Sequence, residues 1–164
     1  MEPNNFYSRN LYEAHLCPWI DKPIIKVITG MRRVGKSCLL KQLIQQLDTQ
    51  RVPQRHIHLI DKESIEFDAI ATYQDLNGYL KTRTSGIKGK QYLLIDEVQE
   101  IEQWEKAVNS YLKDGNWDIY LTGSNAHMLS SELATLLSGR YVEIQIYSLS
   151  LPEFLQFNQH NVES

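Results

Sequence analysis

The sequence predicts an α/β fold, with a parallel five-stranded sheet that carries helices on both faces. Two observations support this class. Five short apolar segments alternate along the chain with segments of helical spacing. Two of the apolar segments run directly into glycine or acidic residues, as central parallel strands do beside a binding site. The 164 residues, 42% hydrophobic and 23% charged, suit one domain with a sizeable core.

The first third of the chain predicts a helix, a strand and a second helix. Helical spacing is visible from Arg9 to Trp19, and an apolar run from Ile24 to Thr29 is typical of a buried strand. A second helical stripe follows at Leu39, Leu40, Leu43, Ile44 and Leu47. The middle third predicts a strand over His56–Asp61, a helix over Phe67–Thr82 and a strand over Gln91–Asp96.

The last third continues the alternation. A helical stripe at Trp104, Val108, Tyr111 and Leu112 precedes a strand over Asp118–Asn125. The next helix starts near Met128 and ends at Gly139, and Val142–Ile146 alternates in polarity like an edge strand. Leu149–Phe157 predicts a new helix, so we expect a core domain over residues 1–150 and a further helical segment over 151–164.

The stretch Gly30 to Ser37 follows the first strand and fits Gly-x-x-x-x-Gly-Lys-Ser/Thr. Gly30 and Gly35 allow backbone N–H groups to point into the loop, and the helix N-terminus adds positive potential. Lys36 would reach the β- and γ-phosphates, and Ser37 would ligate Mg²⁺. The expected nucleotide-binding stretch includes Met31, Arg32, Arg33, Val34 and Cys38. The alternative is a plain glycine turn between strand and helix.

Asp96 and Glu97 form the second chemical motif, at the end of the Gln91–Asp96 strand. Asp96 would hold Mg²⁺ through water, and Glu97 would orient and deprotonate an attacking water. Ser124 and Asn125 end the following strand, where they could sense the γ-phosphate or hold the water. A role as helix cap is the alternative for this pair, and both roles are compatible.

Charge, cysteine content and hydropathy narrow the functional classes and the cellular locations that the sequence allows. The net charge of −3 gives no overall footprint for nucleic acid, although the basic stretch with Lys81, Arg83, Lys88 and Lys90 could touch a polyanion. Cys17 and Cys38 are too few for a disulfide framework, and Cys38 is expected to be a buried thiol. With no apolar run of membrane-spanning length and no signal peptide, we expect a cytoplasmic protein.

At these motifs the chain resembles a bacterial and archaeal family of AAA-type ATPases that carry a C-terminal domain of unknown function. The matching motifs are the loop, Asp96–Gln99, Trp104, Thr122–Ser124, Leu137–Arg140 and Ser148–Phe154. The resemblance implies a three-layer P-loop NTPase core with strand order 5-1-4-3-2. It also implies phosphate and metal binding by Lys36 and Ser37, and metal binding by Asp96.

The resemblance further implies Glu97 as catalytic base, Ser124 or Asn125 as sensor, and Arg140 as an arginine finger, in its own subunit or a neighbour's. We therefore expect Mg²⁺-dependent ATP hydrolysis coupled to an attached C-terminal domain or a partner, in a protein that could form a homo-oligomer. Two alternatives stay open: a nucleotide-dependent switch without hydrolysis, and a P-loop kinase. A GTPase is disfavoured because the chain lacks an Asn/Thr-Lys-x-Asp element.

Overall fold

The computed structural model describes residues 9–124, 130–151 and 153–155. Its centre is a five-stranded parallel sheet in the order β2-β3-β4-β1-β5. This confirms the predicted fold class and the strand order 5-1-4-3-2. The strands are β1 (Ile25–Gly30), β2 (Ile57–Asp61), β3 (Gln91–Asp96), β4 (Trp117–Ser124) and β5 (Tyr141–Ile146).

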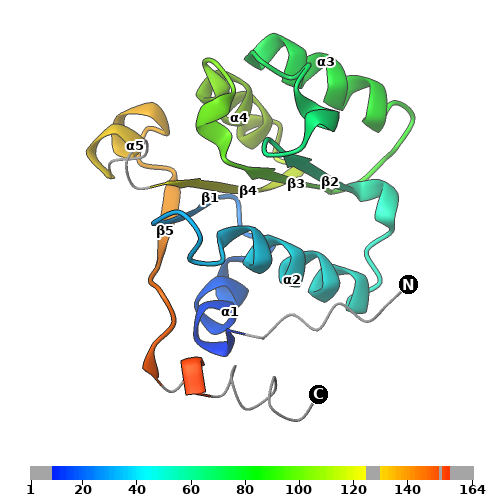
Figure 1. The fold of residues 1–164 in the computed structure, drawn as a ribbon. Coiled ribbons are helices and arrows are strands. Elements are labelled where there is room, and N and C mark those ends of the chain that lie inside the picture. Colours follow the sequence, from blue (N-terminus) through cyan, green and yellow to red (C-terminus); the bar gives the residue numbers. More distant parts are fainter. Residues whose placement is uncertain (1–8, 125–129, 152, 156–164) are drawn as a thin grey trace.

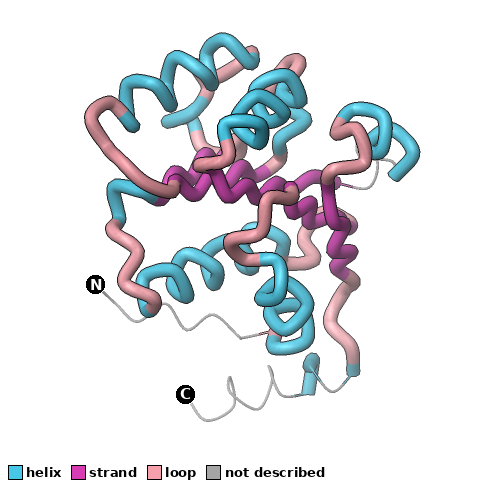
Figure 2. The backbone as a smooth tube through the Cα atoms, turned by 180° about the vertical axis from the view of Figure 1, so that it is seen from behind, coloured by secondary structure: helices cyan, strands magenta, loops and turns pink. Residues whose placement is uncertain are grey.

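Helices cover both faces of the sheet, so the molecule has three layers (Figures 1 and 2). The α-helices are α1 (Asn10–Leu16), α2 (Lys36–Thr49), α3 (Tyr73–Thr84), α4 (Trp104–Asp114) and α5 (Ser130–Leu136). In Figure 1, α1 and α2 lie below the sheet, and α3 and α4 lie above it. Short 3₁₀ turns, η1 (Cys17–Trp19), η2 (Gln54–His56), η3 (Ile65–Phe67) and η4 (Val98–Glu100), connect the elements.

Two apolar cores follow from the alternation of side chains along the strands. One core lies under α3, α4 and α5, and takes Leu93 and Ile95 from β3. The other lies against α1 and α2, and takes Leu94 of β3 and Tyr120 of β4. The central strands β1 and β3 are buried at every position, as expected of parallel strands covered on both faces.

Two predictions differ from the structure. The helix predicted over Phe67–Thr82 begins only at Tyr73, because the Thr72 hydroxyl and the Asp75 carboxylate form a reciprocal capping box there. Cys38 is exposed, contrary to the expected buried thiol. It lies in the first turn of α2, on the side opposite the stripe that Leu39, Leu43 and Leu47 bury.

Candidate functional site

The loop between β1 and α2 depends on its two glycines. Gly35 has φ +98°, in the region that residues with a side chain rarely adopt. Gly30 is the last residue of β1, and a Cβ there would lie 2.5 Å from the carbonyl oxygen of Ile146 in β5. The loop therefore reaches α2 through a conformation suited to glycine and lies directly against the end of the neighbouring strand.

Lys36 begins α2 and is buried at the centre of the loop. Its ammonium donates to the carbonyl oxygen of Met31 at 3.0 Å and lies 3.4 Å from that of Gly30. It also lies 3.3 Å from Oε1 of Glu97, and both side chains are nearly buried, with 4% and 11% of their surface exposed. The predicted phosphate-binding lysine and the predicted base thus meet at one point.

A threonine of β4 joins Asp96, the last residue of β3, to Glu97, which follows it. The Thr122 hydroxyl donates to the Asp96 carboxylate, and the same oxygen accepts from the backbone N–H of Glu97 at 2.9 Å. Glu97 has φ +54°, a left-handed conformation that is costly for a residue with a side chain and is concentrated at functional sites. Ser124, at the end of β4, is buried on the same edge of the sheet.

Lys36 and Glu97 border a cavity of about 720 Å³. Its lining consists of Arg32, Arg33, Gly35, Lys36, Ser37, Cys38, Glu63 and Glu97. Three cations face two carboxylates, and the N-terminus of the fourteen-residue helix α2 adds its partial positive charge. The cavity can therefore hold a polyanion beside a carboxylate that could accept a proton.

Two predicted site residues lie apart from this cluster. Asn125 is outside the described residues. Arg140 precedes β5, and the register pairs Tyr141 with Ile25 but Ile146 with Gly30. Arg140 is thus at the opposite edge of the sheet from the loop, roughly 20 Å away at 3.3 Å per residue. Its guanidinium lies 3.4 Å from Oδ1 of Asn109, and its role as an arginine finger stays a prediction.

Three residues near the cavity were not predicted as site residues. Thr122 and Gln99 were visible only as members of the family motifs, whereas Glu63 lies in a turn after β2 that carries no sequence signal. Gln99 donates from Nε2 to Oε2 of Glu97 at 2.5 Å, and its own Oε1 is buried and has no hydrogen-bond partner among the described residues. The Glu97 carboxylate is consequently held from two sides, by Lys36 and by Gln99.

His56 and His58 contact the Gln91 side chain. No group of three or more His, Cys, Asp or Glu in the described part of the chain could hold a metal ion. Burial lowers the pKa of His58. Within the same part of the chain, no helix has the length and apolar character needed to cross a bilayer.

Comparison with known proteins gives a consistent result. A family model described as an AAA domain matches residues 22–155. An uncharacterized protein of Haemophilus influenzae is 45% identical over 157 residues, which cover 96% of this chain and 39% of that protein. The uncharacterized protein MJ1544 of Methanocaldococcus jannaschii is 37% identical over 139 residues, covering 85% of this chain and 30% of its own length.

Among solved structures, the closed state of Hsp104 with ATPγS and FITC casein resembles the chain with a TM-score of 0.62 at 16% identity. The match covers 93% of this chain and 29% of Hsp104. At that identity the likeness concerns the fold alone. The chain spans about two fifths or less of the two curated relatives described above.

Proposed function

Since this chain belongs to the AAA domain family, whose fold implies nucleotide binding, we propose that it binds ATP with Mg²⁺ and hydrolyses it. One observation carries the proposal: the ammonium of Lys36, inside the glycine-bounded loop, lies 3.3 Å from the carboxylate of Glu97. The first group would bind the γ-phosphate and the second would activate the water that attacks it. Gly30 to Ser37, with Cys38, would form the nucleotide-binding stretch.

The side chains present suit Mg²⁺. Ser37, which carries a hydroxyl, borders the cavity. Asp96 is the last residue of β3, and its carboxylate accepts a hydrogen bond from the Thr122 hydroxyl. Hydroxyl and carboxylate oxygens are the donors that this small, hard cation accepts, with phosphate oxygens and water completing its octahedral shell. Bound there, Mg²⁺ would neutralise charge on the β- and γ-phosphates.

In this proposal, Lys36, Glu97 and Ser124 each have a task in the reaction. Lys36 would turn from the Met31 carbonyl and Glu97 toward the phosphates, which frees one face of the Glu97 carboxylate. Glu97 would accept a proton from water as the water oxygen bonds to the γ-phosphorus and the bond from phosphorus to the bridging oxygen breaks. The products are ADP and inorganic phosphate. Ser124 lies at the strand end where a polar group could report on the γ-phosphate.

Two substitutions test this assignment. Lys36→Ala removes a charge-assisted contact, so ATP affinity measured by calorimetry should fall by about ten- to a hundredfold. Glu97→Gln keeps size and hydrogen bonding but removes the base, so ATP should still bind while phosphate release falls by roughly two to four decades. Unchanged ATP affinity in a folded Lys36→Ala protein would refute the phosphate loop.

The outcome for Glu97 separates the alternatives. Tight ATP binding with no phosphate release in the wild type would favour a switch that does not hydrolyse ATP. Equal phosphate release in wild type and Glu97→Gln would show that Glu97 is not the catalytic base and would favour a P-loop kinase. Because the curated relatives are longer than this chain, we also propose that the nucleotide state acts on a further domain or a partner.

A further inference from the structure

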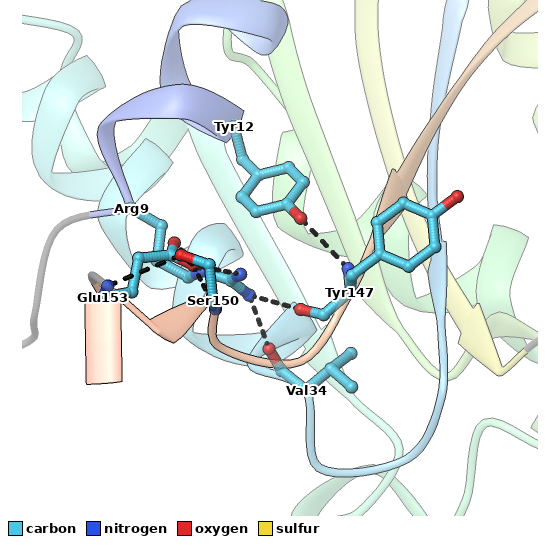
Figure 3. A network of polar contacts seen from close by, with 6 residues as sticks. All are labelled: Arg9, Tyr12, Val34, Tyr147, Ser150 and Glu153. Atoms are coloured by element: carbon cyan, nitrogen blue, oxygen red, sulfur yellow. Dashed lines mark hydrogen bonds and ion pairs between the residues drawn. The ribbon is translucent and has the colours of Figure 1, made fainter. Parts of the chain in front are cut away.

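A buried arginine lies outside the predicted site but contacts the phosphate loop. Arg9, just ahead of α1, has a side chain only 9% exposed. From one nitrogen it donates to the carbonyl oxygens of Val34 at 3.0 Å and Tyr147 at 2.9 Å. Its other nitrogens bind the two carboxylate oxygens of Glu153 at 3.0 and 3.4 Å (Figure 3). One side chain thus joins the loop to the chain that leaves β5.

The contact with Val34 orients the loop. In a trans peptide the C=O of one residue and the N–H of the next point in opposite directions. Arg9 holds the Val34 carbonyl, so the N–H of Gly35 is directed away from Arg9, and Gly35 lines the cavity. A cation on the carbonyl also polarises the peptide and strengthens its N–H as a donor. Arg9 therefore prepares one of the amides expected to bind phosphate.

The contacts with Tyr147 and Glu153 fix what we call the exit segment, residues 147–151 and 153–155. Glu153 accepts from the backbone N–H and the hydroxyl of Ser150, each at 2.7 Å, as in a capping box. The Arg9 bond lowers the pKa of Glu153 to about 2. Tyr12 packs its ring 4.4 Å from the Arg9 guanidinium and accepts the N–H of Tyr147 at 3.1 Å (Figure 3).

A second contact joins the loop to β5 without Arg9. Gly30 approaches the carbonyl of Ile146 so closely that a Cβ would lie 2.5 Å from it. Ile146 is the last residue of β5, directly before the exit segment. The loop therefore contacts β5 at its first residue, and near its end it is joined to the exit segment through Arg9.

We propose that Arg9 is a positioning residue that couples the phosphate loop to the exit segment. Phosphate in the loop and a docked exit segment each stabilise the conformation in which Arg9 binds Val34, Tyr147 and Glu153, and by linkage the effect is reciprocal. The nucleotide part of this coupling rests on the proposed ATP binding. The positioning part does not, because it concerns the nucleotide-free protein described above.

The first test is hydrogen exchange in the nucleotide-free protein. Arg9→Ala should speed amide exchange in both the loop and the exit segment, by about ten- to a hundredfold if a charge-assisted contact is lost. Arg55→Ala, which removes an exposed arginine, should leave exchange in both segments unchanged. Exchange in Arg9→Ala equal to that of wild type would overturn the proposal, whether or not the chain binds ATP.

The second test is ATP–Mg²⁺ affinity by calorimetry. Arg9→Ala should weaken binding about tenfold or more. Arg9→Lys keeps the charge but lacks the planar fork, so it should also weaken binding. If Arg9→Ala does not fold, Arg9→Lys and Glu153→Gln decide, and ATP should slow exchange of the exit segment less in both than in wild type. If Arg9→Lys binds ATP with wild-type affinity, only the positive charge of Arg9 matters and not its hydrogen bonds, which would overturn the coupling.

Failure of the two proposals can be told apart. A wild-type protein that binds no ATP refutes the proposed function, while the nucleotide-free exchange still decides the role of Arg9. A wild-type protein that binds ATP, yet shows the same exchange of the exit segment with and without nucleotide, refutes the coupling and leaves the proposed function intact.

Discussion

Gly30→Ala is the substitution whose effect the structure defines most sharply. The added Cβ would lie 2.5 Å from the Ile146 carbonyl oxygen and 3.0 Å from Cγ2 of Val34, whereas ordinary contact begins at 3.4 Å. The Ile146 oxygen is backbone, and Gly30 pairs with Ile146 in the sheet register, so the oxygen cannot rotate away. Strand β1 must move from β5, or the loop must shift.

Overpacking of this kind costs about 1–3 kcal/mol. With a urea slope of about 2 kcal/mol per molar, the unfolding midpoint should fall by roughly 0.5–1.5 M. ATP affinity should fall with it, because the loop starts at the displaced residue. Gly78→Ala is the matched control. Gly78 lies inside α3, and apart from its own helix backbone no atom of the described residues would lie within 4 Å of an added Cβ, so the variant should gain about 0.5–1 kcal/mol.

Urea unfolding monitored by circular dichroism, with calorimetry of ATP binding, measures both quantities. A Gly30→Ala protein with the midpoint and the ATP affinity of wild type would refute the close contact between the loop and β5. It would also remove one of the two links on which the coupling through Arg9 depends. A lower midpoint in both alanine variants would instead indicate that the assay responds to any glycine replacement.

Three further predictions concern charged residues. Lys26→Met leaves the fully buried Asp118 carboxylate without its cation, so it should lower the free energy of unfolding by about 3–5 kcal/mol. Urea unfolding measures this loss, and a smaller loss would contradict the presence of a buried ion pair. Glu153→Gln should destabilise the protein at neutral pH. Because folding lowers the pKa of Glu153 from 4.5 to about 2, the difference in stability between wild type and variant should fade as pH falls from about 4.5 toward 2. Urea titrations across that pH range check this sign. If Arg140 acts from a neighbouring subunit, wild-type ATPase activity per subunit should rise with protein concentration. The activity of Arg140→Ala should stay low and flat, below that of wild type by up to three to five decades. Matching activity curves for the two proteins would refute this role.

The sequence predicts the sheet well because its strands are apolar runs bounded by glycine, proline or acids. Topology alone predicts that Lys36, Asp96, Glu97 and Ser124 lie at one edge of the sheet, and the structure brings them to that edge. Whether they bind and hydrolyse ATP stays a prediction. The predicted domain boundary at residue 150 is likewise untested.

The misses have physical causes. The start of α3 depended on a capping box that competes with the apolar spacing of Phe67 and Ile70. The distance of Arg140 from the loop could not be predicted from the sequence, because it depends on the register of β5 against β1. Arg9 carries no local signal at all, because its three partners come from the loop and from the exit segment, both far from it in the sequence.

The strand order gives the phosphate loop two different flanks. On one side, β4 and β3 follow β1, and they supply Ser124, Thr122 and the acids Asp96 and Glu97. On the other side lies β5, whose end touches Gly30 and continues into the segment bound by Arg9. Under the proposed function, groups on the first flank would change how fast the γ-phosphate is cleaved. Under the proposed coupling, groups on the second flank would sense whether the loop is filled, because a movement of the loop would displace the chain that leaves β5.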